Sequence, residues 1–215
     1  MRTVIPMLAV AVLSAAAVAG CSTHSTGTPA PVPTTTGTAT SPSPGGGSSA
    51  TSGAPGKLLA PPVPKPLKAS RYLTTKTICQ MLDIKQLTSL GLPHAKASGP
   101  SSTKLATGCD YNDSTTGNGI SVSFETINKH GLSDIYAQQS SMAYWQPTTI
   151  QGYPAVAASQ DDARKDGTCQ MWVGFSNQLA GYGLYDGHPD PSGTVACKKA
   201  KQVASQMITT LIKYP

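Results

Sequence analysis

The sequence predicts an α+β domain in which helices pack on an antiparallel sheet, with a C-terminal helix and two disulfides. Three observations predict this fold. Segments with helical and strand periodicity follow one another in the order ααββαβββα, which gives about five strands. Four cysteines lie after residue 70. A stretch rich in Thr, Ser, Pro and Gly ends near residue 70, so the domain is expected over residues 71–215.

Residues 1–20 have the organisation of a secretory signal peptide. Arg2 supplies a positive start, and an apolar run from Val4 to Val18 follows. This run is shorter than the about 20 apolar residues that a membrane-spanning helix needs. Val18-Ala19-Gly20-Cys21 resembles the bacterial lipobox, in which the cysteine receives a diacylglycerol through a thioether before cleavage. An ordinary secretory peptide or a retained membrane helix is the alternative.

Cys21 is therefore the predicted lipidation site. Two or more acyl chains on one cysteine give stable membrane attachment. The lipobox resemblance thus implies a lipoprotein on the extracytoplasmic face of the cell membrane, and the membrane is its first expected partner.

Residues 21–70 are expected to form a disordered tether. Between residues 22 and 70 there is no aromatic and no acidic residue. Such a segment cannot bury enough apolar area to offset the entropy of ordering it. The proline-rich stretch 61–66 should be stiffer and polyproline-like. The tether is interpreted as a spacer, and its Ser and Thr residues beside Pro are candidate acceptors of O-linked sugars.

The charge distribution argues against nucleic acid as a partner. The chain carries a net charge of +6, but residues 71–215 hold twelve Lys and Arg residues and all ten acidic residues. No basic stripe with interleaved aromatic residues is present. The domain therefore has a net charge of only about +2, and the remaining positive charge lies in the leader and the tether.

The cysteines of the domain predict two disulfides. An even number of cysteines in an oxidising compartment is typical of disulfide pairs. Three pairings are possible, and the sequential one closes two loops of about 30 residues, each worth roughly 3 to 4 kcal/mol. The spacings contain no Cys-x-x-Cys pair and no His at ligand distance, so neither a metal nor another cofactor is expected. The four residues are Cys79, Cys109, Cys169 and Cys197.

Hydrophobic periodicity places the individual elements. Residues 77–90 are expected as two short helices with a break near Asp83, which is a candidate N-cap, and with Gly91 as the C-cap. Ser133 is a candidate cap for a helix over 134–143, and 197–212 has the strongest helical pattern. Strands are expected over 105–112, 120–125, 150–156, 168–176 and 178–185.

Several short motifs accompany the cysteines of the domain. They are Cys79-Gln80-Met81-Leu82, Leu90-Gly91-Leu92, Gly108-Cys109-Asp110-Tyr111, Ile150-Gln151-Gly152-Tyr153-Pro154-Ala155, Cys169-Gln170-Met171-Trp172-Val173 and Cys197. In this cysteine order and local sequence, about residues 70–215 resemble the actinobacterial lipoproteins grouped as "domain of unknown function 3558". One departure is Tyr111, where such proteins commonly have Trp. The resemblance implies pairing of neighbouring cysteines, Cys79 with Cys109 and Cys169 with Cys197, and it implies no activity.

A search for catalytic patterns gives no constellation. Ser101-Ser102-Thr103-Lys104 fits the SxxK pattern of penicillin-binding proteins, but the companion motifs are missing. His94, His130 and His188 fall in predicted loops without a nucleophile. Asp161-Asp162 lacks the alternating ligand pattern of a calcium loop. The sequence therefore predicts a protein that is not an enzyme.

Three aromatic residues form the candidate binding face. Trp172 alternates with Met171 and Val173, and Tyr182 and Tyr185 lie on the next strand. Exposed aromatics on a sheet are suited to a glycan, a lipid or another envelope protein. If helices cover both faces, the same residues form a second core layer. The expected function is ligand or partner binding; the alternatives are an enzyme acting on cell-wall material and a structural partner-docking module.

Overall fold

The computed structural model describes residues 58–103 and 105–215. The predicted signal peptide, the lipidation site Cys21 and the tether up to residue 57 lie outside the described residues, as does Lys104. Within the described ranges, no helix is long and apolar enough to cross a membrane.

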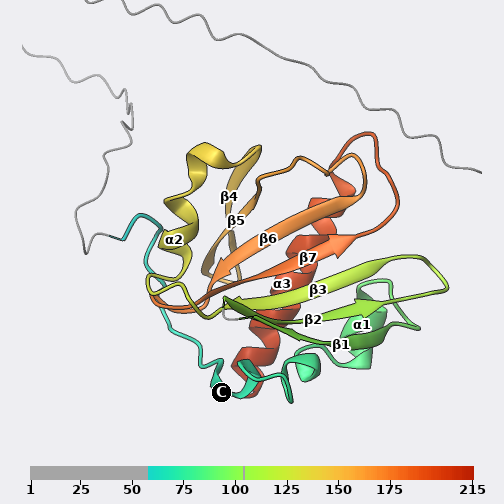
Figure 1. Ribbon diagram of the computed structural model, residues 1–215, viewed down its shortest axis with the longest axis horizontal. Helices are drawn as coiled ribbons and strands as arrows, with labels where there is room; N and C mark the ends of the chain where they lie inside the picture. The colour runs from blue at the N-terminus through green and yellow to red at the C-terminus, as the bar shows by residue number, and fades with distance from the viewer. Residues whose placement is uncertain (1–57, 104) are drawn as a thin grey trace, which may run out of the picture. The chain divides into compact units, whose positions relative to one another are not determined.

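Seven strands form one sheet in which every neighbouring pair is antiparallel, in the order β1-β2-β3-β7-β6-β5-β4 (Figure 1). The antiparallel sheet confirms the sequence prediction, but the predicted number of about five strands is wrong. The two additional strands are the edges, β1 and β4. The strands are β1 (Lys96–Ser102), β2 (Ala106–Asn112), β3 (Gly119–Glu125), β4 (Tyr144–Ile150), β5 (Tyr153–Ser159), β6 (Thr168–Gly174) and β7 (Ala180–Asp186).

The edge strands escape sequence prediction because each contains proline and buries little. In β1 nearly every residue is exposed, and a β-bulge lies between Ala97 and Gly99, next to Pro100. In β4, Pro147 takes an edge position, where the missing N–H breaks no central ladder. Proline and bulges also protect an open edge from pairing with another chain. The same features remove the alternation by which a strand is recognised in sequence.

Local capping interactions set both ends of helix α1. Asp83 caps α1 through a capping box: its Oδ1 accepts a hydrogen bond from the Gln86 N–H, and the Gln86 Oε1 accepts one from the Asp83 N–H, both at 2.8 Å. Gly91 follows with φ of 90°, which confirms its role at the C-terminus of the helix. The helices are η1 (Ser70–Tyr72), η2 (Ile78–Gln80), α1 (Ile84–Ser89), α2 (Leu132–Tyr136), η3 (Gln139–Ser141) and α3 (Val195–Lys213).

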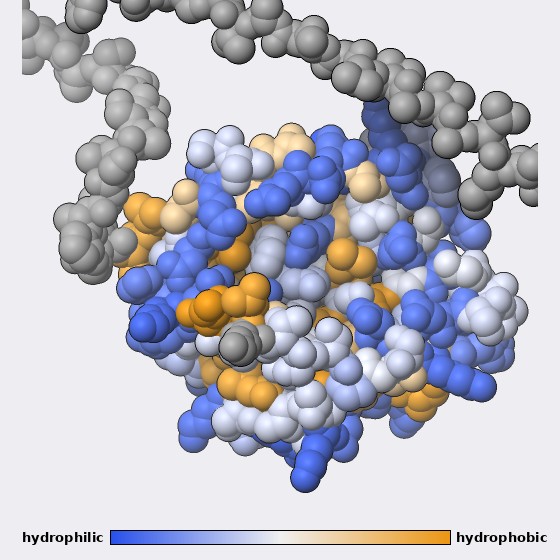
Figure 2. Space-filling model, in the orientation of Figure 1, coloured by the Kyte–Doolittle hydropathy of each residue, from blue (hydrophilic) through white to orange (hydrophobic). Residues whose placement is uncertain are grey.

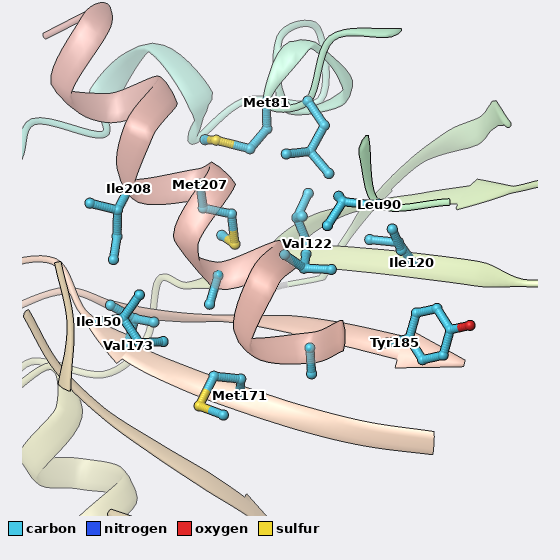
Figure 3. Close-up of a cluster of buried hydrophobic side chains, with 14 of the residues drawn as sticks. Met81, Leu90, Ile120, Val122, Ile150, Met171, Val173, Tyr185, Met207 and Ile208 are labelled. Carbon is cyan, nitrogen blue, oxygen red and sulfur yellow. The ribbon is translucent and has the colours of Figure 1, made fainter. Parts of the chain in front are cut away.

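One face of the sheet, here called the helical face, is covered by α3 and α1. In Figure 1, α3 crosses behind the central strands β3, β7 and β6. Met207 and Ile208 of α3 are fully buried, together with Val122 and Val173 of the sheet (Figure 3). Gly183 allows this close approach, because a Cβ at that position would lie 2.8 Å from the Val203 side chain of α3. A continuous apolar core results.

Both disulfides have the sequential pairing. Cys79 is bonded to Cys109 and links η2 to β2. Cys169 is bonded to Cys197 and links β6 to α3. The structure therefore confirms the pairing that the family resemblance implies, and each bond fastens a helical element to the sheet.

The opposite face of the sheet, here called the outer face, is only partly covered. Helix α2 lies on it together with the chain from residue 58 onward. The backbone N–H groups of Leu59 and Ala60 donate to the Ser133 Oγ at 3.1 Å, and the Val63 N–H donates to the Asn177 Oδ1 at 3.0 Å. Residues 58–70, whose composition is that of the tether, therefore contact the domain.

Ser133 has a different role from the predicted one. Helix α2 begins at Leu132, after Gly131, and makes no side-chain cap hydrogen bond. Ser133 lies inside the helix, and its hydroxyl holds the incoming chain instead. The prediction of a Ser133 cap is wrong because the hydroxyl is used across the fold rather than within its own turn.

Candidate functional site

The uncovered part of the outer face contains two neighbouring cavities. The first has a volume of about 300 Å³ and lies over strands β1, β2, β3 and β7. The second has a volume of about 400 Å³ and lies between the β2 and β3 ends, α2 and β6. We call the two together the outer-face groove. The groove is lined chiefly by Ser101, Thr103, Leu105, Asp110, Ser121, Ser123, Glu125, Ile127, Met142, Gln170, Trp172 and Tyr182.

An aromatic pair lies at the centre of the groove. Trp172 on β6 is directly opposite Tyr182 on β7, and their ring centroids are 4.9 Å apart in an edge-to-face arrangement. Tyr182 lines the first cavity and Trp172 lines the second. The Trp172 Nε1–H donates to the Ala158 carbonyl at 3.2 Å, which fixes the ring against β5. Both side chains are half-buried, so part of each remains open to the groove.

Two carboxylates on the neighbouring strands β2 and β3 flank the aromatic pair, and a third, that of Asp161, also lines the second cavity. Asp110 lines the first cavity and accepts a hydrogen bond from the Ser121 hydroxyl. Glu125 lines the second, and burial raises the pKa of its carboxyl group. Burial also raises the pKa of Tyr182, and among its neighbours Glu125 and Asp110 raise it further. The carboxylates therefore give the groove a negative potential at its centre.

Apolar side chains border the second cavity. Leu105 and Ile127 are each 53% exposed, although both are large and hydrophobic. They are held together by the backbone, since the Ile127 and Thr126 N–H groups both donate to the Leu105 carbonyl. Figure 2, in the orientation of Figure 1, shows hydrophobic residues gathered among hydrophilic ones on this side of the molecule. The groove thus combines aromatic, aliphatic and acidic groups.

Tyr185 does not belong to this surface, which corrects the predicted binding face. It lies three positions after Tyr182 on the same strand, and alternation puts the two side chains on opposite faces. Tyr185 is buried in the core of the helical face, as Figure 3 shows. Of the three predicted residues, the structure brings together Trp172 and Tyr182 only.

The sequence does not indicate the acidic and hydroxyl residues of β2 and β3 as part of the binding face. Ser121, Ser123 and Glu125 alternate with the apolar residues of β3, so their common face was predictable. Their position beside Trp172 was not, because it depends on β7 lying between β3 and β6. Asp110 reaches the same face through its pairing with Ser121.

Of the residues in the catalytic and calcium-loop patterns, Asp161 lines the second cavity. Ser101 and Thr103 line the first cavity, while Lys104 is outside the described residues. His130 pairs with Asp134 at 3.1 Å, and the His188 Nε2 lies 2.8 Å from the Thr116 carbonyl oxygen. Neither histidine lines the groove. No group of three or more metal-ligating side chains occurs in the part of the chain that the structure describes.

Fold and site define a disulfide-bonded α+β domain with a closed helical core on one face of its sheet and an aromatic, acidic groove on the other. The chain belongs to the family described as "Protein of unknown function (DUF3558)", whose model matches residues 16–210. No curated protein and no solved structure is significantly similar to it.

Proposed function

We propose that this chain is a lipid-anchored extracytoplasmic protein, attached through Cys21, whose domain binds a ligand or partner in the outer-face groove without transforming it. The observation that carries the proposal is the Trp172–Tyr182 pair, which lies between two cavities on an uncovered sheet face. The volume of each cavity falls within the range of small-molecule binding sites, about 300 to 1,000 Å³.

The lining groups indicate the chemistry of the ligand. Aromatic rings offer flat apolar contact and attract cations over their faces. The carboxylates of Asp110 and Glu125 accept hydrogen bonds and favour positive charge. A ligand with one apolar part and one amine or multiply hydroxylated part fits this combination.

Binding is favoured over catalysis by what surrounds the hydroxyl groups. Nucleophilic catalysis by serine needs an adjacent base that is itself oriented by a third group. Ser121 donates to the Asp110 carboxylate, and Ser123 donates to the Thr107 carbonyl at 3.4 Å. Neither a histidine nor a lysine is among the described residues that line the two cavities, so Ser121 and Asp110 lack the third member of such an arrangement, and both hydroxyls are suited to positioning a ligand.

Tryptophan fluorescence tests the proposal, because Trp145 and Trp172 are the two tryptophans of the chain. Trp145→Phe leaves Trp172 as the reporter of the groove. Three fractions are titrated separately: purified cell-wall glycan, envelope lipid and soluble envelope protein. We expect one of them to cause a saturable change in the Trp172 emission. Glu125→Gln should weaken this response at neutral pH, while the exposed Asp166→Asn should leave it unchanged.

Three outcomes contradict the proposal. If none of the fractions changes Trp172 emission, the groove is not a binding site. If Glu125→Gln and Asp166→Asn respond alike, the ligand binds elsewhere. If the active fraction is chemically converted during the titration, as mass spectrometry would show, the chain is an enzyme and the alternative interpretation is correct.

A further inference from the structure

A second candidate binding surface follows the exposed side of α3. One cavity of about 420 Å³ lies where the last turns of α3 meet α1 and η1, and another of about 560 Å³ lies where its first half meets the end of α1 and the β4–β5 turn. The two cavities share Ser89 and Gln206, so they adjoin each other. We call them together the basic cleft, because five cations line it: Arg71, Lys85, Lys198, Lys201 and Lys213.

Side-chain hydrogen bonds fix the walls of the basic cleft. The Gln86 Nε2 donates to the Thr210 Oγ1 at 2.9 Å, which holds α1 against α3. The Gln151 Nε2 donates to the Ser205 Oγ at 2.8 Å and to the Thr209 Oγ1 at 3.1 Å, which holds the β4–β5 turn against the same helix. The cleft is therefore a hollow between elements that are fastened to one another, and not a single solvated helix face.

The charge of the basic cleft is strongly positive. All ten acidic residues of the chain are among the described residues, and of these Asp83 alone lines the cleft. Its carboxylate accepts the Gln86 N–H in the capping box of α1. Within residues 58–103 and 105–215, none of the five cations takes part in an ion pair. The cleft therefore favours an anionic ligand.

The spread of the cations along α3 indicates a long ligand. From Lys198 to Lys213 the helix rises by about 22 Å, at about 1.5 Å per residue. The residues of α3 that line the cleft recur at intervals of three and four, which places them in a continuous stripe along the helix. One small anion cannot contact charges this far apart, whereas a chain with an anionic group on successive units can.

The remaining lining indicates a chain of sugar units. Glutamine amides and serine and threonine hydroxyls make up most of it, and these groups match the hydrogen bonds of sugar hydroxyls. The aromatic residues Tyr72 and Tyr214 lie at one end, and Tyr214 is 43% exposed. Binding of a nucleic-acid strand by base stacking needs aromatic rings along its length. The lining is therefore better suited to a polysaccharide.

We propose that the basic cleft binds an anionic polysaccharide, whose charged groups contact the five cations and whose hydroxyl groups contact the amides and hydroxyls between them. This contact is separate from the proposed ligand of the outer-face groove, because α3 lies on the other face of the sheet (Figure 1). The two surfaces also differ in charge, since carboxylates line the outer-face groove. The domain would thereby hold a charged polymer on one face while the groove on the other stays open.

Titration calorimetry with defined polymers tests the proposal on residues 22–215, which hold every described residue. Polygalacturonate and dextran sulfate are anionic polysaccharides with different charged groups, and dextran is a neutral one. Polyglutamate is an anionic chain without sugar hydroxyls. We expect binding to polygalacturonate or dextran sulfate that is weakened by added salt, none to dextran, and weaker binding to polyglutamate of the same length.

Two pairs of substitutions locate the contact. Lys85→Gln with Lys213→Gln removes charge from the first cavity, and Lys198→Gln with Lys201→Gln removes it from the second. All four side chains are exposed, so circular dichroism should be unchanged. Each pair should weaken binding about fivefold, or about 1 kcal/mol, the sum expected of two exposed ion pairs.

The matched control is Lys129→Gln with Lys165→Gln, which removes two exposed charges that line neither cavity and should leave binding unchanged. An equal loss in this pair would mean that net charge alone acts, which overturns the proposal. So would equal or tighter binding of polyglutamate or a single-stranded oligonucleotide, failure of both anionic polysaccharides to bind, or a loss confined to one cavity. Trp172 emission reports the outer-face groove separately, so the two proposals fail independently.

Discussion

The two faces of the sheet use the same strands for different purposes. On the helical face, Ile120, Val122 and Phe124 of β3 are each at most 1% exposed and pack beneath α3. On the outer face, Ser121 and Glu125 of the same strand line open cavities. A two-residue period therefore separates a dry core from a polar groove within seven residues.

The coverage of the two faces explains the difference. Helix α3 is 19 residues long and spans the central strands, so apolar residues beneath it are fully buried. Helix α2 has five residues and, with the chain from residue 58, covers one part of the outer face. What remains uncovered is the groove. The stability of the domain should thus depend on the helical face, and binding should depend on the outer face.

Phe124→Ala should show the largest difference between the faces. Phe124 is fully buried and lies 5.3 Å from the Phe175 ring, so its truncation should cost about 3 to 5 kcal/mol of unfolding free energy. Tyr182→Ala, on the neighbouring strand but on the outer face, should cost about 1 to 2 kcal/mol. Denaturant unfolding measures both. Equal losses would mean that the groove is as important for stability as the core.

Removing each disulfide separately is expected to have the next largest effect. The bonds Cys79–Cys109 and Cys169–Cys197 span 30 and 28 residues, so the loop entropies that they remove are nearly equal. Each Cys→Ala double variant should lose about 3 to 4 kcal/mol in denaturant unfolding. A much larger loss for the pair that joins α3 to the sheet would show that native contacts of the helix, rather than loop entropy, dominate.

Much of the helical face was predictable from sequence because its signals are local. Asp83 and Gln86 lie three residues apart and form the capping box themselves. The apolar stripe of α3 repeats at helical spacing from Ala196 to Leu211. The alternation of β3 and β6 identifies their buried sides.

The outer-face groove was predictable only in part, because it depends on long-range pairing. The strand patterns indicate Trp172 and Tyr182, but the prediction for Tyr185 is wrong because it lies an odd number of residues from Tyr182 and so faces the other side of the sheet. Asp110 and Glu125 join the pair only through the order β2-β3-β7-β6. The edge strands are not predictable in this way, because their prolines and their exposure hide the strand pattern.

Ser133→Ala should loosen the chain that covers part of the outer face. The substitution removes the acceptor of the Leu59 and Ala60 N–H groups, and Ala60 is buried. An unsatisfied buried N–H costs about 1 to 3 kcal/mol, and we expect the cost to appear as faster amide exchange at Ala60. Ser141→Ala is the control, because the Ser141 hydroxyl is exposed and donates to the nearby Gln138 carbonyl rather than holding another segment. Unchanged exchange at Ala60 would mean that apolar contacts alone hold this segment.

A substitution of Asp190, just before α3, should have the smallest effect on stability, and this effect should depend on pH. Hydrogen bonds from the Val195 N–H and the Ser192 hydroxyl hold the pKa of Asp190 at about 2, below its ordinary value of 3.8. Because the folded pKa is depressed, the stabilisation is present above pH 3.8 and is lost as pH falls toward 2. Asp190→Asn should therefore lower the melting temperature at neutral pH, and the difference from the parent should shrink below pH 3.8. A difference that is constant with pH would mean that the Asp190 side chain acts through geometry rather than charge.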